Sequence, residues 1–126
     1  MICSVDGKVY DNIIAGLTES FTVVEGKNSG TSLYRSRSIR DITGIKIGHI
    51  ITFFRDDNTE LFDSLCDYLF KTKRESVMLE VADGQSTIAY EAGYSAGSRK
   101  LITDTGDERI WDELTVTFFP MEAQIA

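Results

Sequence analysis

The first feature that could do chemistry is a serine between two glycines. The segment GYSAG at residues 93–97 matches GxSxG, the turn that holds a nucleophilic serine between a strand and a helix in α/β-hydrolases. Such an enzyme also needs a helix directly after the serine and a histidine later in the chain. The only histidine, His49, precedes Ser95, and the residues after Ser95 show no helical period. We therefore expect a strand end and a turn here, with a hydrolase as the less favoured alternative.

A second candidate is the acidic segment DTGDE, which begins at Asp104. Its DTG resembles the aspartic protease signature, but only twenty residues follow Gly106, too few for the flap strand that such proteases place later. Asp104, Asp107 and Glu108 could also offer oxygen ligands to calcium, yet they lack the spacing of an EF-hand. The segment is therefore expected to be a hairpin turn, and a small hydrolase using Asp104 is again the weaker alternative.

The cysteines and the histidine are expected to be structural. Cys3 and Cys66 lie sixty-three residues apart with no CxxC motif, so we interpret them as small buried hydrophobic residues and expect no disulfide. His49 falls in the apolar register of its strand, which favours a buried or interface histidine over a catalytic base. One histidine and two distant cysteines also cannot form a zinc site. The sequence thus predicts no catalytic residue, no cofactor and no metal.

Three arginines lie within six residues in the segment LYRSRSIRD, on a chain whose net charge is -7. This basic stripe could dock on an acidic patch of a neighbouring copy. The alternative is a solvated edge strand protected by its charges. The candidate interface residues are Arg35, Arg37, Arg40, Asp104, Asp107 and Glu108.

The elements that must position these residues are mostly strands. Asp-Gly pairs at residues 6–7 and 83–84 stand between apolar runs and predict hairpin turns. The polar, glycine-containing stretch 25–32 is expected to be a loop. The last strand should stop at Pro120, which cannot donate a ladder hydrogen bond. Apolar side chains alternate with the period of a β-strand over residues 17–23, 45–53, 77–81, 88–94 and 114–118.

One segment has the period of a helix. From residue 57 to 71 the apolar side chains recur at intervals of one, three and four, which places them on one stripe. Asp57 or Asn58 is the expected N-cap, and Glu60 lies in the first turn. The predicted fold class is mainly β (α+β): an antiparallel β-sandwich or small barrel with one flanking amphipathic helix at about residues 58–71. Residues 1–126 are expected to form a single domain.

Composition removes several classes of function. The chain has 126 residues, of which 42% are hydrophobic and 26% charged, as in ordinary globular proteins. Its 20 acids against 13 bases disfavour a nucleic-acid binder, because binding to phosphate requires a basic face. No run of eighteen apolar residues is present, and the N-terminus lacks the pattern of a signal peptide. We expect that the protein does not associate with membranes. We also expect that it is synthesised in a reducing cytoplasm.

Taken in order, several segments resemble small virion proteins encoded in the tail modules of bacteriophages and prophages of Gram-positive bacteria. The most specific are the block VVEGKNSGTSLYRSRSIRDITG, the segment NTELFDSLCDYL after an acidic turn, and W-x-x-L-x-V-x-F followed by PMEAQ near the end. The order of strands, one helix and more strands is also similar to the superfold of tail-tube, distal-tail and type VI secretion tube proteins, which assemble as hexameric rings.

The resemblance implies a non-enzymatic structural protein of the virion tail, made and assembled in the host cytoplasm. It would form a homo-oligomer, a hexameric ring of the tail tube, distal tail or tail-completion type, with other tail proteins above and below. DNA would pass through the lumen without specific binding, because a lumen lined with acids repels phosphates. An assembly adaptor or chaperone that is absent from the finished virion is the alternative. None of the segments that carry the resemblance is a catalytic signature.

Overall fold

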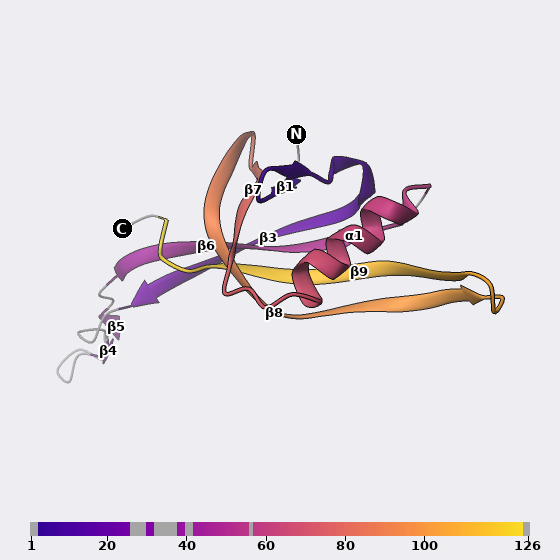
Figure 1. Cartoon of the computed structure of the whole chain (residues 1–126). Coiled ribbons are helices and arrows are strands. Elements are labelled where there is room, and N and C mark those ends of the chain that lie inside the picture. Colours follow the sequence, from indigo (N-terminus) through magenta and orange to yellow (C-terminus); the bar gives the residue numbers. More distant parts are fainter. Residues whose placement is uncertain (1–2, 26–29, 32–37, 40–41, 56, 125–126) are drawn as a thin grey trace.

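A computed structural model of the chain describes residues 3–25, 30–31, 38–39, 42–55 and 57–124. These described residues form one α-helix, one short 3-10 helix and nine strands (Figure 1). The helices are α1 (Thr59–Phe70) and η1 (Asp11–Ile13). The strands are β1 (Cys3–Val5), β2 (Lys8–Val9), β3 (Ile14–Glu25), β4 (Gly30–Thr31), β5 (Ser38–Ile39), β6 (Ile42–Phe53), β7 (Val77–Asp83), β8 (Ser86–Asp104) and β9 (Arg109–Pro120).

Seven of the strands form one sheet in the order β2-β1-β7-β8-β9-β6-β3, and β4 pairs with β5. Every pairing is antiparallel. The sheet curls, so that β1 and the β7–β8 hairpin lie over β6 and β3 (Figure 1). A hydrogen bond from Tyr90 on β8 to His49 on β6 joins the two halves of the sheet. The prediction of a mainly β fold with one amphipathic helix is confirmed.

The core lies between the two halves of the sheet and under α1. Apolar side chains that alternate along the strands point into it, as their period of two predicts. Burial of these side chains is the main force that stabilises the curled sheet. The fully buried members include Val5, Leu79 and Val81 from one half, Ile51, Phe53 and Val116 from the other, and Phe62, Leu65 and Leu69 from α1.

The helix agrees closely with its prediction. Asn58 is the N-cap residue, and its carbonyl accepts a hydrogen bond from the amide of Phe62 at 3.0 Å. Glu60 lies in the first turn, where its negative charge interacts favourably with the positive end of the helix dipole. The predicted stripe faces the sheet, except that Phe70 at the end of the helix is partly exposed.

Both predicted glycine turns are present, one of them displaced by a residue. Asp6 and Gly7 have φ of 49° and 88°, as a two-residue hairpin turn with two positive φ angles requires. In the second hairpin Asp83 pairs with Ser86, so the central residues are Gly84 and Gln85 rather than Asp83 and Gly84. Gly84 has φ of 56°, and the turn takes this register because glycine occupies its first central position.

Two predicted loops are partly strand. β3 continues to Glu25 and β4 covers Gly30–Thr31, so part of the expected loop 25–32 belongs to strands, while residues 26–29 and 32 lie outside the described residues. The expected strand end at Ser95 is wrong, because β8 continues through it to Asp104. Two-stranded pairing with β9 supports this extension, and apolar alternation alone could not reveal it.

Candidate functional site

Two ribbons of paired strands extend from the body of the molecule in opposite directions (Figure 1). The pairing of β6 with β9 runs from His49 opposite Phe118 to Phe53 opposite Leu114. On one side of this region, residues 98–104 and 109–113 form the β8–β9 ribbon. On the other side, residues 21–25 and 42–47 form the β3–β6 ribbon. Each ribbon therefore extends beyond the region in which β6 and β9 pair.

Both ribbons expose large apolar side chains. Phe21 is 65% exposed and Ile42 53% exposed on the β3–β6 ribbon. On the β8–β9 ribbon, Leu101 is 41% and Ile102 is 52% exposed. Phe21 lies opposite Ile47 in the register and thus on the same face as the core, but it is exposed and follows by two residues Glu19, which bonds to Asp83 of the β7–β8 hairpin. The sequence did not indicate these surfaces. Apolar alternation identifies which face of a strand is apolar, but it does not show how far along the strand another layer packs on that face.

β3 is the end strand of the seven-stranded sheet and has 12 residues. Its backbone pairs with β6 on one side, and among the described strands none pairs with its other side. The opposite end strand, β2, has only 2 residues. Long, open edge strands are sites where another chain can add a strand, whereas very short ones are protected. β3 is therefore the sheet edge most open to strand addition.

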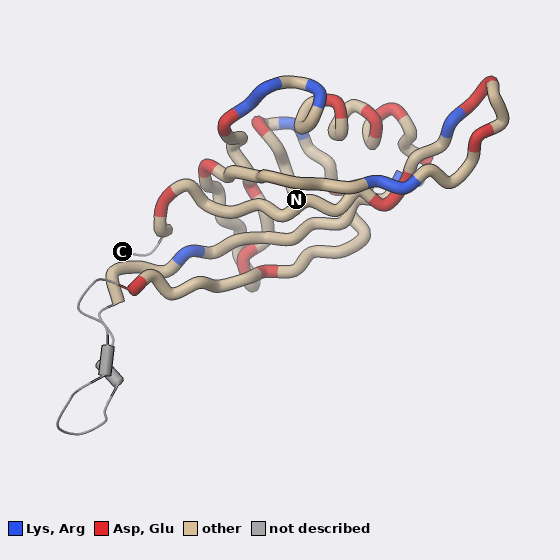
Figure 2. Tube along the Cα trace, turned by 90° about the horizontal axis from the view of Figure 1, so that it is seen from below, with Lys and Arg blue, Asp and Glu red and all other residues tan. Residues whose placement is uncertain are grey.

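The predicted acidic patch lies at the tip of the β8–β9 ribbon (Figure 2). Residues 105–108 form a hairpin turn, as expected, in which the amide of Thr105 donates to the carbonyl of Glu108 at 3.0 Å. Asp104 accepts a hydrogen bond from the amide of Gly106 at 3.0 Å and pairs with Arg109 at 3.5 Å. Among the described residues no group of three or more His, Cys, Asp and Glu side chains is placed to hold a metal.

The basic half of the predicted interface, Arg35, Arg37 and Arg40, lies outside the described residues. Strands β4 and β5, which border these arginines in the sequence, are at the opposite end of the molecule from the 105–108 turn (Figure 1).

The outward face of β3, β6 and β9 is uncharged along two rows of side chains that run across the strands. The residues of these rows carry hydroxyl groups or are small or aliphatic, and the hydroxyls of Thr52 and Thr115 are 3.3 Å apart. One row contains Thr18, Ile50 and Thr117, and the other contains Gly16, Thr52, Thr115 and Ser98.

His49 is fully buried and joins three strands. Its Nδ1 is 2.7 Å from the hydroxyl of Tyr90, and its Nε2 is 3.2 Å from the carbonyl of Ala82. Because a carbonyl oxygen only accepts, Nε2 carries the proton, and Nδ1 accepts from the Tyr90 hydroxyl. Glu19 on β3 also approaches, with 3.7 Å between its Oε2 and Nε2. The prediction of a buried histidine is confirmed, while its partners come from distant strands that the sequence does not indicate.

The environment of His49 alters several pKa values. Burial lowers the pKa of His49, against smaller raising effects of the Ala82 carbonyl and Asp83. The pKa of Glu19 is raised, first by burial and then by its hydrogen bond to Asp83 and the charge of that residue. Burial is also the main cause that raises the pKa of Tyr90. These shifts favour a neutral imidazole bonded to a neutral phenol, an arrangement that holds two layers together.

Ser95 does not occupy a nucleophile turn. It lies within β8, at an irregularity between Tyr94 and Gly97 where the pairing register with β9 shifts. The side chain is exposed, and both ring nitrogens of His49 are engaged by Tyr90 and Ala82. The catalytic arrangement that GxSxG requires, a serine held at a strand-to-helix turn beside a histidine, is therefore not built here.

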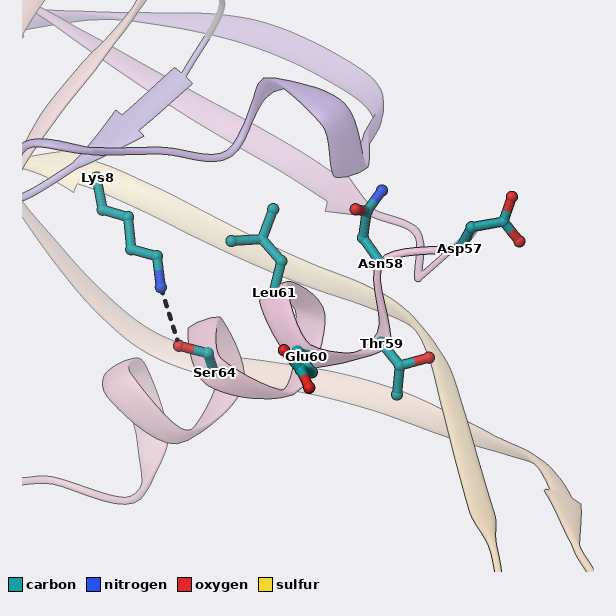
Figure 3. Close-up of a pocket in the computed structure, with 7 residues that line it drawn as sticks. All are labelled: Lys8, Asp57, Asn58, Thr59, Glu60, Leu61 and Ser64. Atoms are coloured by element: carbon teal, nitrogen blue, oxygen red, sulfur yellow. Dashed lines mark hydrogen bonds between the residues drawn. The ribbon is translucent and has the colours of Figure 1, made fainter.

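A hollow of about 630 Å³ lies at the start of α1, beside β2 (Figure 3). The Nζ of Lys8 donates a hydrogen bond to the hydroxyl of Ser64 across it at 3.2 Å. Its lining mixes one cation with the carboxylates of Asp57 and Glu60, together with Asn58, Thr59 and Leu61. This mixture of charges does not form a surface of one sign that would select a ligand by its charge.

The cysteines are free and buried, as expected. Burial, with a contribution from the charge of Asp11, raises the pKa of the Cys3 thiol to about 12, and burial also raises the pKa of Cys66. Thiols are reactive as thiolates, so both side chains are poor nucleophiles at neutral pH. In the part of the chain that the structure describes, no helix is long and apolar enough to span a bilayer.

Comparisons with known proteins show similarity to a solved structure. No protein-family profile matches the chain, and no curated protein matches it significantly. The chain is similar to the crystal structure of the Dit protein of phage SPP1, described as a paradigm of the hub adsorption apparatus in phages that infect Gram-positive bacteria. The identity is 13% and the TM-score 0.49, over 97% of this chain and 50% of that one. This chain thus spans half of the Dit chain, and a likeness at this level does not assign it to a family.

Proposed function

We propose that the protein is a non-enzymatic structural subunit of a phage tail that works by self-assembly into a ring. The observation that carries this proposal is the open edge of β3, whose 12 residues pair with β6 on one side and border exposed apolar side chains such as Phe21. An isolated subunit with such an edge is prone to add a strand from another chain. The resemblance of several segments to tail-module proteins gives the setting in which identical copies would meet.

The test is the mass of the purified protein in solution before and after the edge is blocked. Phe21→Lys places a charge on the exposed end of the inner face of β3, a device by which natural edge strands prevent pairing. The wild-type protein is expected to form a closed oligomer, and Phe21→Lys should shift it to the monomer. Light scattering coupled to size-exclusion chromatography gives both masses.

Val9→Lys is the matched control. Val9 is 50% exposed and lies on β2, the other end strand of the sheet, which is too short to support pairing. This variant should retain the mass of the wild-type oligomer. A wild-type protein that stays monomeric at every concentration, or an oligomer that Phe21→Lys leaves intact, contradicts the proposal.

The predicted pairing of the arginines with the acidic turn remains part of this proposal. Arg35, Arg37 and Arg40 of one copy would contact Asp104, Asp107 and Glu108 of the next. Reversing two of these charges, with Asp107→Lys and Glu108→Lys together, should weaken the oligomer if this contact forms and leave its mass unchanged if it does not.

The proposed ring would be hexameric, would contact other tail proteins above and below, and would let DNA pass without specific binding. Two rows of the outward face of the sheet are uncharged and carry hydroxyl groups, and the chain as a whole is acidic, so these rows give phosphates no basic surface to bind. Mapping of charges in the assembled ring tests this part, because a lumen lined mainly by Lys and Arg would overturn it.

A further inference from the structure

We propose that the β8–β9 ribbon of one copy lies along the β3–β6 ribbon of the next copy, so that subunits join head to tail. The inference rests on the proposed function, since both require identical copies to associate, but it goes further by naming the two unlike surfaces that meet. Its occupant is a second copy of this chain and no other partner.

The first argument is the instability of each ribbon by itself. A two-stranded ribbon in water is at best marginally stable, and a third strand or a packed layer is needed to hold it. The β8–β9 ribbon exposes Leu101 and Ile102, and the β3–β6 ribbon exposes Phe21 and Ile42. Each ribbon therefore has the apolar surface that the other could cover.

The second argument is the open edge on each ribbon. β3 is an end strand, so its outer backbone groups along the β3–β6 ribbon face no described strand. The pairing of β8 with β7 begins at Ala92 opposite Val77 and runs toward the hairpin turn, away from the β8–β9 ribbon. The outer edge of β8 along residues 98–104 is thus available as well. Two open edges can satisfy each other by forming one continuous ladder.

The third argument is the position of the ribbons. They extend from opposite ends of the molecule in both views, so they cannot meet within one chain (Figures 1 and 2). Pairing between unlike surfaces of neighbouring copies is a heterologous contact, and repetition of it produces a ring when the rotation closes.

The fourth argument is charge, which favours unlike over like pairing. The turn of the β8–β9 ribbon carries three acids, Asp104, Asp107 and Glu108, against Arg109. Two β8–β9 turns placed together would oppose acids to acids, which costs free energy and disfavours like-to-like contact at these turns.

The experiment is thiol cross-linking with a flexible bismaleimide, which tolerates the unknown register. Thr22 on β3 and Thr103 on β8 are exposed, so Thr22→Cys and Thr103→Cys should preserve the fold, which thermal unfolding checks. The double variant is expected to give a ladder of covalent multimers with loss of the monomer band. Each single variant should remain monomeric on the denaturing gel. Wild-type protein gives the background, because its two cysteines are buried.

The outcomes separate this inference from the proposed function. A single variant that cross-links to itself indicates like-to-like pairing and overturns head-to-tail contact, and so does a double variant that gives no ladder. When cross-linking fails in either of these ways but the same samples form an oligomer by light scattering, the proposed self-assembly stands and only this inference fails. When cross-linking fails and the samples are monomeric, both the inference and the proposed self-assembly fail. A ladder from the double variant alone supports the inference, and its highest band gives the number of copies in the ring.

Discussion

At the scale of single residues, the bonds around His49 show what the sequence contained and what it did not. The position of His49 in an apolar register predicted burial, and the structure confirms it. Its partners Tyr90 and Ala82 follow 41 and 33 residues later, and they reach it only because the β7–β8 hairpin folds over β6. Spacing along the chain carries no information about such a contact, since it depends on how the sheet curls.

Removal of the Tyr90 hydroxyl should destabilise the fold. Tyr90→Phe leaves the buried Nδ1 of His49 without its donor, and an unsatisfied buried acceptor costs about 1–3 kcal/mol. Tyr68→Phe is the control, because that hydroxyl bonds to Asp6 at the surface and its loss should cost less than about 1 kcal/mol. Urea unfolding measures both. Equal losses in the two variants would contradict the role assigned to the buried bond.

Stability should also depend on pH through His49. Burial lowers its pKa below the ordinary value of about 6.5, so below that pH the unfolded chain takes up a proton more readily than the folded one. The stability from the neutral imidazole is thus fully present above about pH 6.5 and is lost as the pH falls. The raised pKa of Glu19 acts in the opposite direction, because the folded chain then binds the proton more readily.

His49→Gln isolates the histidine contribution. The variant should be less stable than the wild type near neutral pH, and the difference in unfolding free energy should narrow between about pH 7 and about pH 5. Urea midpoints at several pH values give this difference. A difference in unfolding free energy that stays constant over this pH range would show that the pKa of His49 is not lower in the folded state than in the unfolded state.

At the scale of elements, glycines on β6 and β3 differ in how closely the neighbouring strands approach them. Gly48 on β6 lies where an added Cβ would be 2.9 Å from the carbonyl oxygen of Phe118 and 3.1 Å from the hydroxyl of Ser20. Gly16 on β3 has more space, since an added Cβ there would meet only Thr52, at 3.9 Å. The alternation that predicts these strands does not distinguish the two glycines.

The two glycines should respond differently to the same substitution. Gly48→Ala forces a neighbouring backbone to move and should cost about 1–3 kcal/mol, as overpacking does. Gly16→Ala should cost nothing or stabilise by a few tenths of a kcal/mol, because it lowers the entropy of the unfolded chain. Chemical denaturation of both variants compares them directly, and a loss at Gly16 as large as at Gly48 would be inconsistent with these distances.

Element boundaries could be predicted where local signals are strong. The helical period with Asn58 before it fixed α1 to within a residue or two, and Pro120 marked the end of β9. The extension of β8 through Ser95 was missed, because small and polar residues there give no alternation and their strand is held by pairing with β9. Strand formation by pairing is a tertiary effect that local sequence cannot supply.

At the scale of the whole molecule, the mainly β class with one covering helix could be predicted, since it depends only on periods of two and 3.6 along the chain. The curl of the sheet could not be predicted. The location of the exposed apolar surface depends on this curl, so it could not be predicted either. Phe21 shares the apolar register of Leu17 on the same strand, yet Leu17 packs against the core while Phe21 lies beyond it. Their difference arises from the length of the β7–β8 hairpin, an element far away in the sequence.

The opposite directions of the two ribbons have a consequence for handling the pure protein. When the β8–β9 ribbon of each copy binds the β3–β6 ribbon of the next, the first and last copies of an open assembly each keep one unused ribbon. Nothing in the contact itself therefore limits growth of the assembly. The rotation between successive copies alone decides whether the assembly closes into a ring. A substitution that alters that rotation by a small amount, without weakening the contact, would convert closed particles into filaments that scatter light and sediment.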